Sequence, residues 1–199
     1  MRHMQTDRSI ETRDRLLAAT EKLIYAGGIH ATGMDRIVRE SGASRKSVYS
    51  YFGSKDELVA EALRRRDERW MAWFSGEVRK APTSRKRLLA MFTVLQGWFS
   101  DGGFHGCAFI NAAGEIGDPD HPIRKVAKLH KERLLGFIQQ LCADDGAADP
   151  TALGQRLLIL IDGAIAVALV TGDPGAADDA CAIARQILDA PTACLIERT

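Results

Sequence analysis

The chain has 199 residues, 46% of them hydrophobic and 27% charged, and its 27 Lys and Arg against 26 Asp and Glu give a formal net charge of +1. A chain of this length forms one domain, or a small domain joined to a larger one, and buries a core, which excludes disorder as its main state. Taken alone, the balanced charge also argues against a polyanionic partner, because neutralising phosphates requires an excess of Lys and Arg.

The cysteines and the apolar segments exclude further classes. The four cysteines lack the spacing of a zinc site or of a disulfide framework, so we expect reduced, mostly buried thiols and neither metal nor cofactor. Residues 1–10 lack the apolar core of a secretory signal, which favours the cytoplasm. The longest apolar run, residues 157–170, is too short to span a membrane, so a buried helix and no membrane partner are expected. The cysteines are Cys107, Cys142, Cys181 and Cys194.

Helical periodicity dominates the chain and predicts an all-α fold. Between residues 9 and 25 the apolar positions recur at spacings of three, four and seven residues, which indicates a first helix. Gly27 and Gly28 follow directly, and glycine is the residue that most often ends a helix.

Three helix starts follow in quick succession. Thr32 and Asp35 have the spacing of a capping box and predict a short helix over residues 33–41. Ser44 is placed to cap a second short helix over residues 45–52. Ser54 and Glu57 form another capping box, at the start of a long helix that continues past residue 69. A glycine follows each of the two short helices.

Two short helices joined by a tight turn with a glycine are typical of a helix-turn-helix unit, whose second helix can enter the DNA major groove. Val48 and Phe52, four residues apart, are expected to pack the second helix onto its neighbours. The alternative is an ordinary solvated surface helix. The polar and aromatic side chains left for the other face of the second helix are Arg45, Lys46, Ser47, Tyr49, Ser50 and Tyr51.

Residues 32–37 (TGMDRI) and 41–58 (SGASRKSVYSYFGSKDEL), preceded by residues 13–19 (RDRLLAA), resemble the DNA-binding domain of the tetracycline-repressor (TetR) family of transcriptional regulators. Val38, Ser41, Ala43 and Lys46 depart from the usual family residues. The first three are volume changes at packed positions, which neighbours absorb. Lys46 adds a cation that reads either a base or a phosphate.

The resemblance implies roles for individual residues. Thr32 would place its hydroxyl and nearby backbone N–H groups on a phosphate. Lys55 opposes the dipole of its own helix, which makes sense if it faces a phosphate. Tyr49 would reach the DNA backbone, and Tyr51 either contacts a base or packs on the first helix. The residues expected at the DNA are Thr32, Ser44, Arg45, Lys46, Ser47, Tyr49, Tyr51 and Lys55.

The second region is predicted to be a helical bundle, with helices over residues 84–99, 107–116, 121–143, 151–171 and 176–188. We therefore divide the chain into a DNA-binding domain, residues 1–58, and a second domain, residues 59–199, which is reached through the long fourth helix. The resemblance implies that the second domain binds a small-molecule ligand and forms the dimer. Residues 106–115 (GCAFINAAGE) are similar to a segment found in one branch of the family.

The run at residues 157–170 is apolar nearly all round, which an outer helix of a monomer would not tolerate. With the Ala-rich helix at residues 176–188 it is predicted to form a four-helix seam across a two-fold axis. The alternative is a central helix buried within its own chain. The expected interface residues are Leu158, Ile161, Asp162, Ile165, Ala166, Leu169, Ile183 and Ile187.

Large side chains gather in the second region, either as plain core or as the lining of an apolar pocket with a few polar groups. Asn111, Glu115, His130 and Asp162 are the polar candidates. Asn111 and Glu115 share one helix face, four residues apart. The expected pocket residues are Trp70, Phe74, Met91, Leu95, Trp98, Phe109, Asn111, Glu115, His130 and Phe137.

The resulting hypothesis is a homodimeric repressor that binds a near-palindromic operator and is released by a small molecule. Alternatives are an activator, a metal-responsive sensor, or a hydrolase that uses a cluster of acidic and histidine residues. The cluster comprises His105, Glu115, Asp118, Asp120 and His121. Catalytic motifs are lacking, so we expect no enzyme.

The balanced net charge conceals a basic N-terminal region. Residues 1–69 hold 14 Lys and Arg against 11 Asp and Glu, whereas the remaining residues hold 13 Lys and Arg against 15 Asp and Glu.

Overall fold

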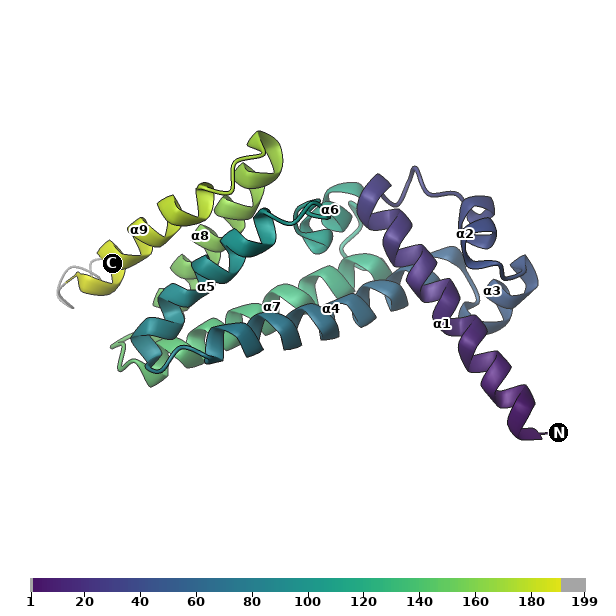
Figure 1. The fold of residues 1–199 in the computed structure, drawn as a ribbon, viewed down its shortest axis with the longest axis horizontal. Helices are drawn as coiled ribbons and strands as arrows, with labels where there is room; N and C mark the ends of the chain where they lie inside the picture. Colours follow the sequence, from purple (N-terminus) through teal and green to yellow (C-terminus); the bar gives the residue numbers. More distant parts are fainter. Residues whose placement is uncertain (1, 191–199) are drawn as a thin grey trace. The chain divides into compact units, whose positions relative to one another are not determined.

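A computed structural model describes the backbone of residues 2–190 and the side chains of residues 10–190. Over this part of the chain the structure contains nine α-helices and no strand (Figure 1), which confirms the predicted all-α class. The helices are α1 (Arg2–Gly27), α2 (Met34–Ser41), α3 (Arg45–Phe52), α4 (Lys55–Arg79), α5 (Ser84–Phe99), α6 (Ala108–Glu115), α7 (Pro122–Asp144), α8 (Pro150–Thr171) and α9 (Ala176–Asp189).

The predicted helix bounds agree closely with the structure. The ranges predicted for α3 and α5 are the observed ones, those for α2, α8 and α9 differ by one residue at one end, and those for α6 and α7 differ by one residue at both ends. Only α1 begins much earlier than its apolar pattern indicated. Gly28, Gly42 and Gly53 follow α1, α2 and α3 with φ of 85°, 64° and 76°, so each adopts the left-handed backbone that favours glycine.

The helices belong to two compact units. The first contains α1, α2, α3, the part of α4 that ends at Arg69, and residues Ala108–His130, which include α6 and the start of α7. The second contains Trp70–Cys107 and the chain from Lys131 onward. These units differ from a division after residue 58, because α6 and the start of α7 fold with the N-terminal helices.

The core of the first unit holds two helices that are too short to be stable alone. Helices α2 and α3 have eight residues each, and they are anchored mainly through Ile37 and Val48, both fully buried. Around these two side chains lie apolar residues of α1 and α4. The buried cluster consists of Leu16, Leu17, Leu23, Ile37, Val48, Leu58 and Ala62.

Ion pairs join α1 to α4 beside this core. Glu21 of α1 is 8% exposed and accepts hydrogen bonds from Arg66 at 3.0 Å and Arg69 at 2.5 Å. The Arg66 guanidinium also lies over the Tyr25 ring, 3.6 Å from its centroid. A nearly buried carboxylate with two arginine partners is well compensated, so this seam holds α1 firmly against α4.

In the second unit α8 and α9 pack against each other and against α5. One face of α8 is buried, and the small residues of α9 allow close approach of the helices. Gly154 of α8 lies against α7, and a Cβ there would come within 3.3 Å of the Gln139 Cα. The buried side chains on α8 and α9 include Leu157, Ile161, Ile165, Ala168, Ala177, Ala180 and Ala184.

Helix α8 is longer than the apolar run at residues 157–170 that was judged too short to span a membrane, and it is only partly buried. It has 22 residues and is long and apolar enough to cross a membrane, with 44% of its most apolar window buried. The core helix of a soluble protein passes the same test of length and composition, so this property by itself assigns no membrane. Its buried side chains lie on one face, and the opposite face is uncovered.

Aromatic rings of the second unit pack directly on one another. The Trp70 ring stacks on Phe74 with centroids 4.8 Å apart, and the Trp98 ring meets Phe104 edge to face at 5.0 Å. Phe137 completes the group with its centroid 6.2 Å from that of Phe74. Contacts of this kind are typical of a packed core.

Candidate nucleic-acid interface

Helix α3 begins at a side-chain cap, as predicted. The Ser44 Oγ accepts a hydrogen bond from the Ser47 backbone N–H at 3.0 Å and lies 2.9 Å from the Ser47 Oγ. The Gly53 N–H donates to the Tyr49 carbonyl at the other end. The cap fixes the first turn of α3, so the side chains of that turn project from a defined backbone.

The exposed face of α3 carries the side chains expected at the DNA. Val48 is its one fully buried residue, whereas Tyr49 is 54% and Tyr51 36% exposed. Arg45 and Lys46 in the first turn are also exposed. The helix therefore offers two cations, two phenols and hydroxyls to solvent, the donors that phosphates and base edges accept.

Arg45 is not loose in solvent. Its Nε donates to the Asp35 Oδ1 at 3.2 Å, and its Nη2 donates to the same oxygen. This hydrogen bond and the carboxylate charge raise the pKa of Arg45, so the guanidinium stays cationic. The pair joins the first turns of α2 and α3 and directs the guanidinium, while the Nη1 remains available as a donor.

Thr32 differs from its predicted role. Gly33 is the residue before α2, with no side-chain cap, so the predicted capping box is wrong. The Thr32 side chain is fully buried, and its Oγ1 donates to the Gly28 carbonyl at 2.7 Å. The hydroxyl thus closes the turn between α1 and α2 and, being buried, is not exposed to a phosphate.

Lys55, the first residue of α4, donates through its Nζ to the Ile29 carbonyl at 3.0 Å. Its ammonium group has three donors, so two remain for another acceptor. The predicted cap before α4 is confirmed, because the Glu57 N–H donates to the Ser54 Oγ at 3.1 Å.

Comparisons with known proteins agree with this geometry. A sequence profile described as "Bacterial regulatory proteins, tetR family" matches residues 16–62. A crystal structure of a TetR-family transcriptional regulator from Streptomyces coelicolor is similar over 89% of this chain and 94% of that chain, at 31% sequence identity and a TM-score of 0.82. The chain belongs to the TetR family.

Two further relatives have names that state a function. The HTH-type transcriptional regulator YjdC of Escherichia coli is 23% identical over 177 residues, which are 88% of this chain and 93% of YjdC. The HTH-type transcriptional activator FasR of Mycolicibacterium smegmatis is 34% identical over 80 residues, 40% of this chain and 36% of FasR. This TetR-family protein is therefore a DNA-binding transcriptional regulator and not an enzyme.

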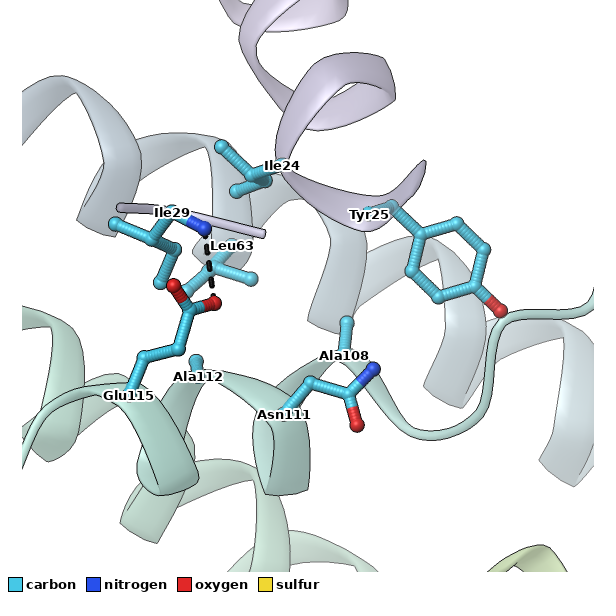
Figure 2. Close-up of a pocket in the computed structure, with 8 residues that line it drawn as sticks. All are labelled: Ile24, Tyr25, Ile29, Leu63, Ala108, Asn111, Ala112 and Glu115. Carbon is cyan, nitrogen blue, oxygen red and sulfur yellow. Dashed lines mark hydrogen bonds between the residues drawn. The ribbon is translucent and has the colours of Figure 1, made fainter. Parts of the chain in front are cut away.

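The residues expected to line one ligand pocket lie in both compact units. Asn111 and Glu115 line a small cavity of the first unit, of which Figure 2 shows the surrounding side chains. The other lining residues were not singled out from the sequence. They are Ile24, Tyr25, Ile29, Leu63, Ala108 and Ala112.

Glu115 has a different task from the expected ligand contact. Its carboxylate accepts the backbone N–H groups of Ile29 and His30, both at 2.8 Å, and Figure 2 shows it pointing at this turn. Burial raises the pKa of Glu115, but the two N–H bonds and the His30 ring outweigh burial and lower the pKa below its usual 4.5. The carboxylate is an internal partner of the α1–α2 turn.

His130 is also committed to partners inside the protein. It is 2% exposed, its Nδ1 lies 2.7 Å from the Asp67 Oδ1, and its ring stacks on Phe109 at 3.7 Å between centroids. Histidine at this position joins α7 to α4 and α6. His130 was predicted to line a pocket because a histidine on an apolar helix face has the same sequence pattern whether it lines a pocket or is buried in the core.

The predicted dimer residues divide into two groups. Leu158, Ile161 and Ile165 are buried inside their own chain, so these three assignments are corrected. Asp162 is half-buried, and its Oδ1 accepts from the Lys131 Nζ at 2.5 Å. Ala166, Leu169 and Ile183 are exposed, and Ile187 is half-buried. The uncovered apolar face of α8 also contains residues that sequence reasoning missed, namely Ile159, Val167 and Val170.

The acidic and histidine cluster considered for a metal does not assemble. Glu115 binds the α1–α2 turn, and the His121 Nε2 lies 3.3 Å from the Asp56 carboxylate. Among the residues that the structure describes, no group of three His, Cys, Asp or Glu side chains is placed to hold a metal ion. Cys107 and Cys142 are buried free thiols and Cys181 is half-buried, while Cys194 lies outside the described residues.

Proposed function

We propose that this TetR-family protein is a cytoplasmic homodimeric repressor that binds a near-palindromic operator and is released by a small organic molecule. One observation carries the proposal: α3 is anchored by buried Val48 and by half-buried Phe52, which packs on the same core, and presents Arg45, Lys46, Tyr49, Ser50 and Tyr51 to solvent. Two such helices, one from each protomer, would enter successive major grooves about 34–36 Å apart.

Each exposed group has a proposed role at the DNA. Tyr49 and Lys55 contact phosphates, and Arg45, Lys46 and Tyr51 reach base edges, with Ser44 and Ser47 forming the start of the reading helix. The surplus of basic residues in this region is small, so affinity for random DNA is expected to be modest. Tight binding then requires both heads of the dimer.

The dimer is proposed to form through the uncovered face of α8 together with α9. Ile159 is 61% and Val170 85% exposed, and Gly163 and Ala166 between them are small enough for close helix approach. Apolar side chains at this spacing along one helix face fit a two-fold seam with a second copy of the same chain.

The proposed domains remain residues 1–58 for DNA and residues 59–199 for ligand and dimer. The aromatic group of the second unit is the proposed ligand region, with Met91 and Leu95 in the same helix as Trp98, and because its rings pack on one another a ligand would have to separate them on binding. An organic ligand is favoured over a metal because the described side chains provide no metal-binding group. An activator is the second candidate, since the relative FasR is named as one.

The DNA-binding proposal is tested with Tyr49→Ala. Operator fragments are selected from genomic DNA with the purified protein, and affinity is measured at fixed salt. Leu129→Ala is the matched control, because Leu129 is also 54% exposed but lies on α7. Tyr49→Ala is expected to lose affinity while remaining dimeric, and the control is expected to bind as the wild type. Equal binding by both variants contradicts the role of Tyr49.

The dimer is tested with Val170→Asp, measured by light scattering. Burying an unpaired carboxylate in an apolar seam is costly, so monomers are expected. Thr93→Asp, on the exposed side of α5, is the control and stays dimeric. A dimeric Val170→Asp protein would place the interface elsewhere. Transcription from the selected operator with and without the protein then separates a repressor from an activator.

A further inference from the structure

A single peptide group connects α6 with the start of α4. The Ile29–His30 peptide accepts a hydrogen bond from the Lys55 Nζ at its carbonyl, at 3.0 Å, and donates its N–H to the Glu115 Oε2, at 2.8 Å. The preceding N–H, that of Ile29, donates to the Glu115 Oε1 at 2.8 Å. An ammonium group and a carboxylate thus hold one peptide from its two ends, and each polarises the bond that the other makes.

The turn is built to receive a carboxylate. Gly28 has φ of 85°, and this left-handed residue turns the next two N–H groups toward one point. A Cβ on Gly28 would lie 3.1 Å from the Glu115 Oε1, so a larger residue would displace the carboxylate. The His30 Nδ1 adds a third contact at 3.1 Å.

Both charged residues are unfavourable for their own helices. Glu115 is the last residue of α6 and Lys55 the first of α4, so each faces the helix end of its own sign. Local helix stability would prefer the opposite charges at these positions. Both positions are explained by their shared partner, the peptide group of residues 29 and 30. Ile29 is 86 residues before Glu115 and 26 residues before Lys55 in the sequence.

We infer that Glu115 is a positioning residue for DNA binding: its carboxylate fixes the Ile29–His30 peptide, and the carbonyl of that peptide holds the Lys55 ammonium in place for a phosphate. The inference rests on the proposed phosphate contact of Lys55. One Lys55 donor is used by the Ile29 carbonyl, which leaves two for the DNA. Any change that moves α6 away from the α1–α2 turn releases the peptide, and Lys55 with it.

The test compares the salt dependence of operator affinity among variants. Glu115→Gln keeps the size of the side chain but replaces one acceptor oxygen by an NH₂ group, which cannot accept from an N–H. Glu77→Gln is the control, because Glu77 is paired with Lys80 in the second unit. Lys55→Ala and the double variant complete a cycle. Loss of each phosphate contact reduces the slope of log affinity against log salt by about 0.9.

The inference predicts that Glu115→Gln and Lys55→Ala reduce the slope equally, that the double variant reduces it no further, and that Glu77→Gln retains the wild-type slope. If Lys55→Ala reduces the slope and Glu115→Gln does not, the inference is wrong and the phosphate contact stands. If neither changes it, the contact and the inference both fail.

A second measurement avoids variants of Glu115. Removing the ammonium weakens the polarised N–H bond across the same peptide, so the His30 amide proton of Lys55→Ala is expected to exchange with solvent faster than that of the wild type. The amides of α5 serve as the internal reference and keep their exchange rates. Unchanged exchange at His30 refutes the connection, even if Glu115→Gln does not fold.

Discussion

The His130–Asp67 pair is the feature whose removal is expected to cost the most stability. The two side chains are 2% and 9% exposed, and the Nδ1 lies 2.7 Å from the Oδ1. In His130→Ala the Asp67 carboxylate loses its imidazole partner, and Phe109 loses the ring that stacks on it. Removing one member of a buried pair costs about 3–5 kcal/mol. For a chain of this length, each kcal/mol lowers the Tm by about 2–4 °C.

The expected loss is therefore about 6–20 °C in Tm, measured by calorimetry at one protomer concentration because dimer stability depends on concentration. His30→Ala is the matched control, since the His30 side chain is 70% exposed and its contact with Glu115 is worth less than about 1 kcal/mol. His130→Phe restores the stacked ring but not the hydrogen bond and is expected to recover part of the loss. A Tm for His130→Ala equal to that of His30→Ala would refute the reasoning.

Three further predictions follow from single contacts. Because the folded-state pKa of Glu115 is lowered, its contribution to stability is complete above pH 4.5 and lost as the pH falls through the lower folded value, so the Tm difference between wild type and Glu115→Gln narrows in acid. Burial raises the pKa of the Cys142 thiol to about 11, so iodoacetamide is expected to alkylate half-buried Cys181 before Cys142 at pH 8, and the reverse order by peptide mapping contradicts this. Gly154→Ala crowds the Gln139 backbone and is expected to lose about 1–3 kcal/mol in denaturant unfolding, whereas Gly136→Ala, in open space on α7, gains about 1 kcal/mol; a gain in both would show that α8 can shift.

Most helix bounds could be predicted because their signals are local. These signals act within one helical turn, so the helix ends they mark can be predicted from neighbouring residues alone. They are the Ser44 cap, the glycines after α2 and α3, and the prolines at the start of α7 and α8. The capping box predicted at Thr32 was wrong because it rested on a local signal alone. Thr32 has the spacing from Asp35 of a capping box, but its buried hydroxyl donates to the Gly28 carbonyl instead.

The candidate site was only partly predictable, because its remaining features depend on contacts distant in sequence. The exposed residues of α3 follow from helical periodicity once Val48 is placed in the core. The Glu115 contact with Ile29 spans 86 residues, and no local pattern states it. The one local signal for this contact was the unfavourable position of the Glu115 carboxylate at the C-terminal end of its own helix, which indicates a partner elsewhere in the chain. The exposed face of α8 could not be predicted because α8 is apolar on both sides, so periodicity could not distinguish buried Ile161 from exposed Ile159.

The small buried part of α3, Val48 and Phe52, also bears on how proteins of this kind change their targets. Val48 is buried and Phe52 half-buried against the same core, so substitutions at the exposed positions of α3 are expected to change stability by only about 0.5 kcal/mol each. Natural selection can therefore change the exposed residues of α3 one at a time, because no stabilising substitution elsewhere is needed first. Arg45 is the exception, because Asp35 of α2 directs its guanidinium, so a change in the proposed base contact of Arg45 requires both helices to change together.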